Sequence, residues 1–339
     1  RGITIRASTV SFNYNDTKVN IIDTPGHMDF IAEVERTLRV LDGAVLVISA
    51  KEGIQVQTKI IFNTLAKLNI PTLIFVNKID RKGVCLDEIY TQIKRKLTPN
   101  LAIMQSVKIK DKGDFELTNV RDDKVIQSQI IEKLLDINDY LAEKYINGDV
   151  ITEKEYDNVF LDEVNSCNLY PVLHGSALKD IGIDELLFAI TNYLPVNNDN
   201  ITDNLSAYVY KIDRDEESRK ITFLRVFSGN IKTRQEVPIN DTEETFKIKS
   251  LESIMNGEIV KVDQVNSGDI AIISNANSLK IGDFIGEKYD RVLDIKIAQP
   301  ALRASIKPYD LSKRSKLIGA LFELTEEDPF LDCEINGDT

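Results

Sequence analysis

The stretch Val19-Asn20-Ile21-Ile22-Asp23-Thr24-Pro25-Gly26-His27 decides the fold. Its first four residues are a short β-rich run, and a carboxylate and a Pro-Gly pair follow directly. In open α/β sheets, ligands bind beyond the carboxyl ends of the strands. The stretch therefore predicts a strand that ends at a ligand site, although an ordinary strand-to-helix turn has a similar composition.

The residue types at 23–27 suit a phosphate ligand and its metal ion. A carboxylate such as Asp23 can hold the water shell of Mg²⁺, which prefers oxygen ligands. Gly26 has no side chain, so its backbone N–H can approach a phosphate oxygen closely. We therefore predict a nucleotide-binding turn formed by Asp23, Thr24, Pro25, Gly26 and His27.

Apolar strands alternate with amphipathic helices from residue 1 to about residue 195. Strands are expected at 19–22, 44–49, 72–76 and 170–173, and helices at 30–40, 56–68, 86–97 and 184–194. Such alternation predicts an α/β domain with a mostly parallel sheet. The runs 9–14 and 19–23 are expected to pair as a hairpin that gives the sheet an antiparallel edge.

Other segments mark an insertion and further domains. Residues 98–168 are richly charged and interrupt the alternation, with helical stretches at 130–145 and 153–164, so we expect an insertion there. A polar linker is expected at 197–200. The predicted domains are 1–197, a small β-barrel domain at 204–293 with strands at 206–212, 222–227, 246–251 and 269–273, and the start of an α+β domain at 298–339 with a strand at 302–306 and a helix at 312–325.

Composition excludes several classes of protein. Three widely spaced cysteines fit neither a disulfide framework nor a CxxC metal site, and two histidines cannot form a multi-histidine centre. No apolar run approaches a membrane span, so we expect no membrane partner. Residues 1–6 include no apolar signal core, so we expect a cytoplasmic protein, and we further expect a monomer. The net charge of -12 is unlike that of a free-standing nucleic-acid binder, so contacts with RNA would need local basic patches.

Asn77-Lys78-Ile79-Asp80 follows the apolar run 72–76 and suits a guanine base. One carboxylate, Asp80, can accept both N–H donors of guanine. Adenine lacks those donors, a mismatch that discriminates by about 10⁴-fold or more. Asn77 is expected to tie the loop together, with the stem of Lys78 over the ring. The alternative is a polar loop that merely closes a strand.

Gly175-Ser176-Ala177 also follows an apolar strand. Small residues there would let backbone N–H groups reach the guanine carbonyl. The tripeptide alone is weak evidence, but all three motifs follow strands in the order that a guanine-nucleotide fold requires. His174, just before it, is expected to be a structural histidine.

These motifs resemble those of translational GTPases, the family of elongation factor G. DTPGH, NKID and GSA are similar to its third, fourth and fifth motifs, and Arg1-Gly2-Ile3-Thr4-Ile5 is similar to its second. The resemblance implies a Ras-like GTPase domain that binds GTP and Mg²⁺, with Thr4 and Asp23 at the metal. It also implies that His27 orients the attacking water, where Ras-like enzymes use a glutamine.

Within the family, residues 49–58 and NKID look more like tetracycline-resistance ribosomal protection proteins. The resemblance implies ribosome-dependent GTP hydrolysis that releases tetracycline. Two alternatives stay open: a translocating elongation factor, and a non-hydrolysing GTP-binding scaffold on the ribosome. An ATPase is a third, which Asp80 disfavours.

The phosphate loop GxxxxGK[ST] of the family does not occur in this sequence. That loop supplies the amide cradle and the lysine for the β- and γ-phosphates. We therefore expect the chain to be a fragment of a longer parent, to bind GTP poorly and to be inactive by itself.

Overall fold

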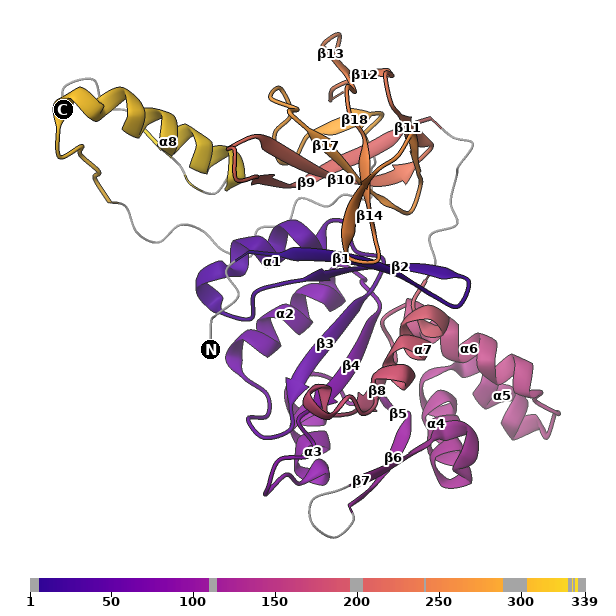
Figure 1. Ribbon diagram of the computed structural model, residues 1–339. Coiled ribbons are helices and arrows are strands. Elements are labelled where there is room, and N and C mark those ends of the chain that lie inside the picture. Colours follow the sequence, from indigo (N-terminus) through magenta and orange to yellow (C-terminus); the bar gives the residue numbers. More distant parts are fainter. Residues whose placement is uncertain are drawn as a thin grey trace. The chain divides into compact units, whose positions relative to one another are not determined.

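The computed structural model describes residues 6–109, 115–195, 204–240, 242–288, 304–328, 331 and 333–334. The chain divides into two compact units (Figure 1). We call Leu41–Val196 the sheet unit, and Arg1–Val40 together with Asn197–Thr339 the β unit. Thr4 and the linker expected at 197–200 lie outside the described residues.

A four-stranded parallel sheet forms the centre of the sheet unit (Figure 1). Its order is β3 (Ala44–Ser49), β4 (Thr72–Asn77), β8 (Tyr170–His174) and β5 (Leu101–Ile103). A parallel sheet covered on both faces needs nearly continuous apolar strands, as the sequences AVLVIS and TLIFVN provide. The strands predicted at 44–49, 72–76 and 170–173 are confirmed.

Helices cover both faces of this sheet. Successive side chains of β4 point to opposite faces, and because both sets are apolar, each face packs against helices. Ile74 and Val76 belong to one buried cluster, and Leu73 and Phe75 belong to another. The first cluster includes residues of α2 (Val56–Lys67) and α3 (Leu86–Lys96). The second includes residues of α4 (Lys124–Ile137), α5 (Asp139–Asn147), α6 (Glu153–Asn165) and α7 (Ile183–Tyr193).

The segment expected to be an insertion, 98–168, contributes a strand to the sheet itself. β5 pairs in parallel with β8, and β6 (Gln105–Ile109) and β7 (Phe115–Asn119) then form an antiparallel ribbon. The expected helix at 130–145 is two helices. Asn138 separates them because its side chain accepts a hydrogen bond from Leu141 N, which caps the start of α5.

The hairpin at the start of the chain belongs to the β unit. β1 (Ser8–Tyr14) and β2 (Thr17–Asp23) pair along their whole length around a tight turn at Asn15, whose φ is 51°. Within the described residues they form a two-stranded sheet of their own. η1 (Met28–Phe30) and α1 (Ile31–Leu38) follow.

The predicted second domain is all β. Its main sheet is antiparallel, in the order β15-β14-β17-β10-β9-β18, and two short ribbons, β11-β16 and β12-β13, join it around an apolar core. The strand expected at 246–251 is shorter, and residues 248–251 separate β13 from β14. The strands are β9 (Ser206–Arg214), β10 (Lys220–Ser228), β11 (Asn230–Lys232), β12 (Glu236–Pro238), β13 (Thr245–Lys247), β14 (Glu252–Met255), β15 (Glu258–Lys261), β16 (Gln264–Asn266), β17 (Ile270–Ser274) and β18 (Phe284–Gly286).

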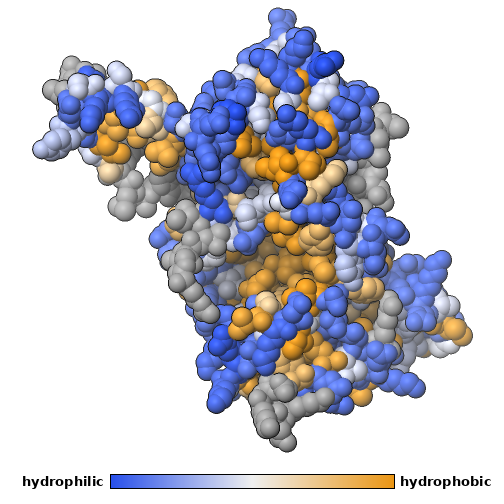
Figure 2. All heavy atoms as spheres, viewed as in Figure 1, coloured by the Kyte–Doolittle hydropathy of each residue, from blue (hydrophilic) through white to orange (hydrophobic). Residues whose placement is uncertain are grey.

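The C-terminal described part is helical. η5 (Leu311–Lys313) leads into α8 (Arg314–Glu327), close to the helix expected at 312–325. Residues 304–306 form no strand, because no described segment pairs with them. Phe322 and Leu324 are exposed on α8, where Figure 2 shows apolar atoms over the helix.

None of the described helices combines the length and the apolar character needed to cross a bilayer. Cys85, Cys167 and Cys333 are free thiols.

Candidate functional site

Asn77 joins the two loops expected to hold a base. It ends β4, and its Oδ1 accepts hydrogen bonds from Lys78 N at 2.7 Å and from Ala177 N at 3.0 Å. The loops follow β4 and β8, which are neighbouring parallel strands, so their starting points lie at the same edge of the sheet. The structure therefore brings the NKID and GSA segments together, with Asn77 as the tie that its sequence position suggested.

Asp80 is half-buried in the turn after β4. Within the part of the chain that the structure describes, its carboxylate has no hydrogen-bond or ion-pair partner. Partial burial removes some hydration from a charged group, so a ligand with paired N–H donors would compensate that cost. Asp80 is thus available for a base, as guanine recognition requires.

Lys78 follows with a left-handed backbone, at φ 65°. Its Nζ lies 3.3 Å from Glu52 Oε2, and this pair is largely exposed. Hydrogen bonds from Ser49 and then from Lys78 hold the pKa of Glu52 below its usual range. Ile79 is buried and its N–H donates to Gly175 O at 3.3 Å, a second link between the loops.

Gly175 is required by packing rather than by access to a ligand. A Cβ there would lie 2.3 Å from Ile181 O and 2.6 Å from Phe75 Cζ. Ser176 is almost fully buried, and its Oγ has no hydrogen-bond partner in the described part of the chain. The loop therefore has little room to change its path.

The amides of this loop are already donated to protein acceptors. Gly175 N donates to Val76 O, Ser176 N to Ile181 O, and Ala177 N to Asn77 Oδ1, all at 3.0 Å. This differs from the expectation that the small residues leave these N–H groups free for a guanine carbonyl. The tight packing explains the difference at Gly175 and Ser176, because a buried N–H needs an acceptor.

Leu178 is a residue that the sequence motif did not indicate. Within the described residues its N–H has no hydrogen-bond acceptor, and its side chain is 78% exposed. It follows Ala177 directly in η4 (Ala177–Lys179). A free amide at the start of a helical turn suits an anionic or carbonyl oxygen, and only the position of a residue, not its type, gives that signal.

The turn at 23–27 lies in the β unit and is more open. Asp23 is exposed at the end of β2, where it pairs across the hairpin with Ser8. Its carboxylate has no partner among the described residues. A Cβ added to Gly26 would meet no atom within 4 Å, so a ligand can approach this backbone closely.

His27 is the end of this turn, and its side chain is 49% exposed. Its Nδ1 lies 3.3 Å from both the backbone N and the carboxylate Oδ2 of Asp29. When the ring is neutral, the Asp29 N–H donates to Nδ1 and the proton is on Nε2. Nε2 has no partner in the described part of the chain, so it can face a water or a ligand.

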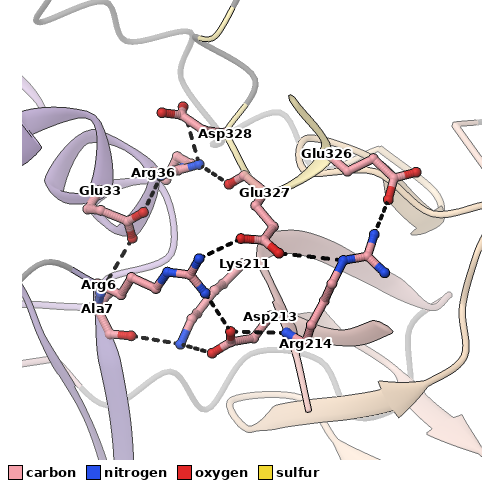
Figure 3. A network of polar contacts seen from close by, with 10 residues as sticks. All are labelled: Arg6, Ala7, Glu33, Arg36, Lys211, Asp213, Arg214, Glu326, Glu327 and Asp328. Carbon is pink, nitrogen blue, oxygen red and sulfur yellow. Dashed lines mark hydrogen bonds and ion pairs between the residues drawn. The ribbon is translucent and has the colours of Figure 1, made fainter. Parts of the chain in front are cut away.

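Ion pairs within the β unit anchor the helix that follows His27. Arg36 of α1 pairs with Glu33 and donates to the backbone oxygen of Glu327 at the end of α8 (Figure 3). The Glu327 carboxylate also lies 2.7 Å from Arg6 and 3.5 Å from Arg214. The helix is thus held firmly while the turn before it stays open.

The residues present suit Mg²⁺ only as part of a larger ligand set. No group of three or more His, Cys, Asp or Glu that could hold a metal occurs in the described residues, and Asp23 supplies one carboxylate. Mg²⁺ usually keeps several waters and takes one or two carboxylates plus substrate phosphates. One carboxylate beside an open backbone fits that pattern.

Comparison with known proteins agrees with this geometry. Residues 1–196 match the family model of the elongation factor Tu GTP binding domain, and residues 204–288 match elongation factor G domain 2. A crystal structure of a Thermus thermophilus protein has the same fold, with a TM-score of 0.86 at 22% identity over 99% of this chain and 55% of that chain.

Several relatives have closer sequences. Tetracycline resistance protein TetP of Clostridium perfringens is 40% identical over 99% of this chain and 52% of its own length. Tetracycline resistance protein TetM from transposon Tn1545 of Enterococcus faecalis is 39% identical over 98% of this chain and 51% of its own length. The chain spans about half the length of the curated relatives it matches. Because the GTP-binding model matches more than half of it, this chain belongs to the translational GTPase family of the elongation factor Tu GTP-binding domain.

Proposed function

We propose that the protein hydrolyses GTP on the ribosome and so releases bound tetracycline. The observation that carries this proposal is identity of about 40% along almost the whole chain to proteins named for tetracycline resistance. The available carboxylate of Asp80 supports guanine as the base, because its two oxygens match the two N–H donors of that base.

The nucleotide contacts fall to the residues expected from the motifs and to Leu178, which the motifs did not indicate. Asn77, Lys78 and Ile79 hold the base loop, and the second loop receives the guanine carbonyl at Leu178 N. Ala177 N can join it only by exchanging its bond with Asn77. The second loop further comprises Gly175 and Ser176. In the β unit, the turn of Asp23, Thr24, Pro25, Gly26 and His27 faces the phosphates, and Thr4 joins Asp23 at the metal.

His27 is the proposed catalytic residue because its Nε2 is without a partner in the described part of the chain. A neutral imidazole can accept from or donate to the attacking water and orient it toward the γ-phosphate. Mg²⁺, when bound, supplies positive charge beside the phosphate oxygens. Asp23 provides a carboxylate for its water shell.

We further propose a cytoplasmic monomer whose partners are guanine nucleotide and the ribosome, its RNA and its proteins, without a membrane partner. The proposed domains are 1–197, 204–293 and a third that begins near 298. The exposed apolar side chains of α8 suit packing against further parts of such a third domain.

Translocation of tRNA and mRNA, as by elongation factor G, is the second candidate. The match of residues 204–288 to the model named for elongation factor G domain 2 is the observation that favours it. The two candidates therefore need a functional test rather than a further structural comparison.

The test measures labelled tetracycline retained on ribosomes in a filter-binding assay. Full-length protein with GTP is expected to displace the drug, whereas GDP or the His27→Ala variant is not. The same preparations are assayed for repeated translocation in a purified translation system. No displacement together with active translocation would establish the second candidate instead.

A further inference from the structure

His174 has an unusual position for a residue outside the nucleotide motifs. It ends β8, is 0% exposed, and directly precedes the loop of Gly175, Ser176 and Ala177. In the parallel pairing of β4 and β8 it stands opposite Val76, the residue before Asn77. The place of His174 therefore fixes where both base loops begin.

Two side chains from other elements hold this residue. The Oη of Tyr90, on α3, lies 2.8 Å from His174 Nε2, with the rings edge-on at 5.5 Å between centroids. The backbone N of His174 donates to Gln105 Oε1 at 2.8 Å, and Gln105 is 1% exposed. One residue thus connects α3 and the β6–β7 ribbon to the strand that precedes the base loop.

The imidazole depends on this single hydroxyl. Its Nδ1 is buried without a hydrogen-bond partner in the described residues, so Tyr90 is the one polar partner of the ring there. Burial lowers the pKa of His174 to about 4 and raises the pKa of Tyr90 above its usual range, so both groups are neutral near pH 7. Loss of the hydroxyl would leave a buried imidazole with no partner, which favours a shift of the ring and its backbone.

Close packing around His174 and Gly175 would transfer a shift of the His174 backbone to the loop that follows it. The carbonyl of His174 would lie only 2.2 Å from a Cβ at Gly182, so that backbone is closely packed. Gly175 is similarly enclosed. A displacement at His174 is therefore transferred to the amides of 176–178 rather than absorbed by empty space.

We propose that Tyr90, Gln105 and His174 are positioning residues that set guanine affinity by aligning the second base loop, without touching the nucleotide. The proposal rests on the guanine site proposed above. Its specific consequence concerns the carbonyl of the base, because the second loop faces that atom while Asp80 faces the N–H donors.

The experiment compares two nucleotides in the full-length protein. Tyr90→Phe removes only the hydroxyl and should weaken GTP binding by about three- to tenfold, the size of one hydrogen bond. 2-Aminopurine riboside triphosphate lacks the carbonyl oxygen and with it the N1–H, so it should bind more weakly to the parent and to every variant. Its affinity should differ between the parent and Tyr90→Phe by less than about twofold, because the contact that Tyr90 aligns is already absent. The ribosome-stimulated kcat at saturating GTP should be unchanged.

Tyr140→Phe is the matched control. It removes the hydroxyl of a tyrosine on α5, which donates a hydrogen bond to Glu155 of α6 at 3.0 Å. It should alter neither affinity. Gln105→Met, which removes the acceptor for His174 N, is the second variant and should reproduce the pattern of Tyr90→Phe. Equal losses for both nucleotides, or unchanged GTP affinity in both variants, would overturn the positioning role.

Asp80→Asn, measured in parallel, separates this failure from that of the guanine site. If Asp80→Asn shifts preference to xanthosine nucleotides while Tyr90→Phe and Gln105→Met are neutral, only the positioning role is wrong. If Asp80→Asn leaves GTP binding unchanged, the guanine site itself is wrong and the positioning role is overturned with it.

Discussion

The base loops of the sheet unit and the His27 turn of the β unit differ in how far the protein satisfies their polar groups. The amides of Gly175, Ser176 and Ala177 all have protein acceptors, and His174 behind them is fully buried. His27 is half-exposed, and within the described residues its polar and ring contacts are with its near neighbours Asp29 and Phe30. The proposed base site is thus largely preformed, whereas the turn of the proposed catalytic residue is open.

The largest expected effect concerns the open turn of His27 in the β unit. His27→Ala in the full-length protein should lower ribosome-stimulated GTP hydrolysis by about 10³-fold or more, because water positioning contributes that much in GTPases. GTP affinity should stay nearly constant, since the base loops are unaffected. Single-turnover hydrolysis on ribosomes and equilibrium nucleotide binding measure the two quantities. Parent-like hydrolysis by the variant would place catalysis on another residue.

Asp80→Asn tests the base loops of the sheet unit. The amide loses one acceptor for the guanine N–H pair, so GTP affinity should fall by about 100-fold, as for a charged hydrogen-bonded pair. Xanthosine triphosphate, which accepts where guanine donates, should gain affinity. Competition binding with both nucleotides gives the ratio, and the largely exposed Glu52→Gln should change it little.

Sequence patterns predicted where the base loops of the sheet unit lie, because strands and loop motifs are local features of the sequence. Apolar strands followed by NKID and GSA indicated where polar groups gather at one sheet edge, and Asn77 bridges the two loops there. The occupied amides and Leu178 N were not predictable, because hydrogen bonding of backbone groups depends on segments far apart in the chain. Ile181, which accepts from Ser176 N, carries no motif.

The β unit shows what local sequence patterns do not indicate. The hairpin was predicted from the runs 9–14 and 19–23 and is confirmed, whereas the sheet edge that it joins stays a prediction. Strand patterns specify which residues face a core but not which edge they join. The hydrogen bond from Arg36 to the backbone oxygen of Glu327 spans 291 residues of sequence, a contact that no local pattern indicates.

Lowering the pH should weaken the sheet unit through His174. Its pKa falls from an ordinary 6.5 to about 4 on burial, so between those values the unfolded chain binds a proton that the folded chain does not. Stability should therefore be lost as pH falls from about 6.5 to 4, by about 3 kcal/mol. Carboxylates with lowered pKa values, such as Glu155 at about 2, lose their contribution only at lower pH. Urea unfolding at several pH values measures the slope, which His174→Gln should remove.

Glycine substitutions compare the packing of the two halves directly. Gly175→Ala places a Cβ 2.3 Å from Ile181 O, so it should destabilise the protein by about 1–3 kcal/mol. Gly26→Ala, with no atom within 4 Å of the new Cβ, should leave the free energy of unfolding almost unchanged. Thermal unfolding of both variants checks this, and equal losses would contradict the difference in packing.

The smallest expected effect concerns the ion pairs of Glu327 at the end of α8, whose backbone oxygen accepts a hydrogen bond from Arg36 of α1. Glu327→Gln removes the charge that faces Arg6 and Arg214, which leaves two cations without that partner. Glu327 is 14% exposed but Arg6 is 54% exposed, so solvent screens the interaction and the loss should be no more than about 1 kcal/mol. The loss should shrink at about 1 M salt, where the screening length is about 3 Å. Glu217→Gln, in a pair with Arg219 whose side chains are 72% and 55% exposed, is the control and should have almost no effect. If urea unfolding at low salt shows equal changes for both variants, the ion pairs of Glu327 are no stronger than ordinary surface pairs. The contrast between an anchored helix α1 and an open turn is then lost.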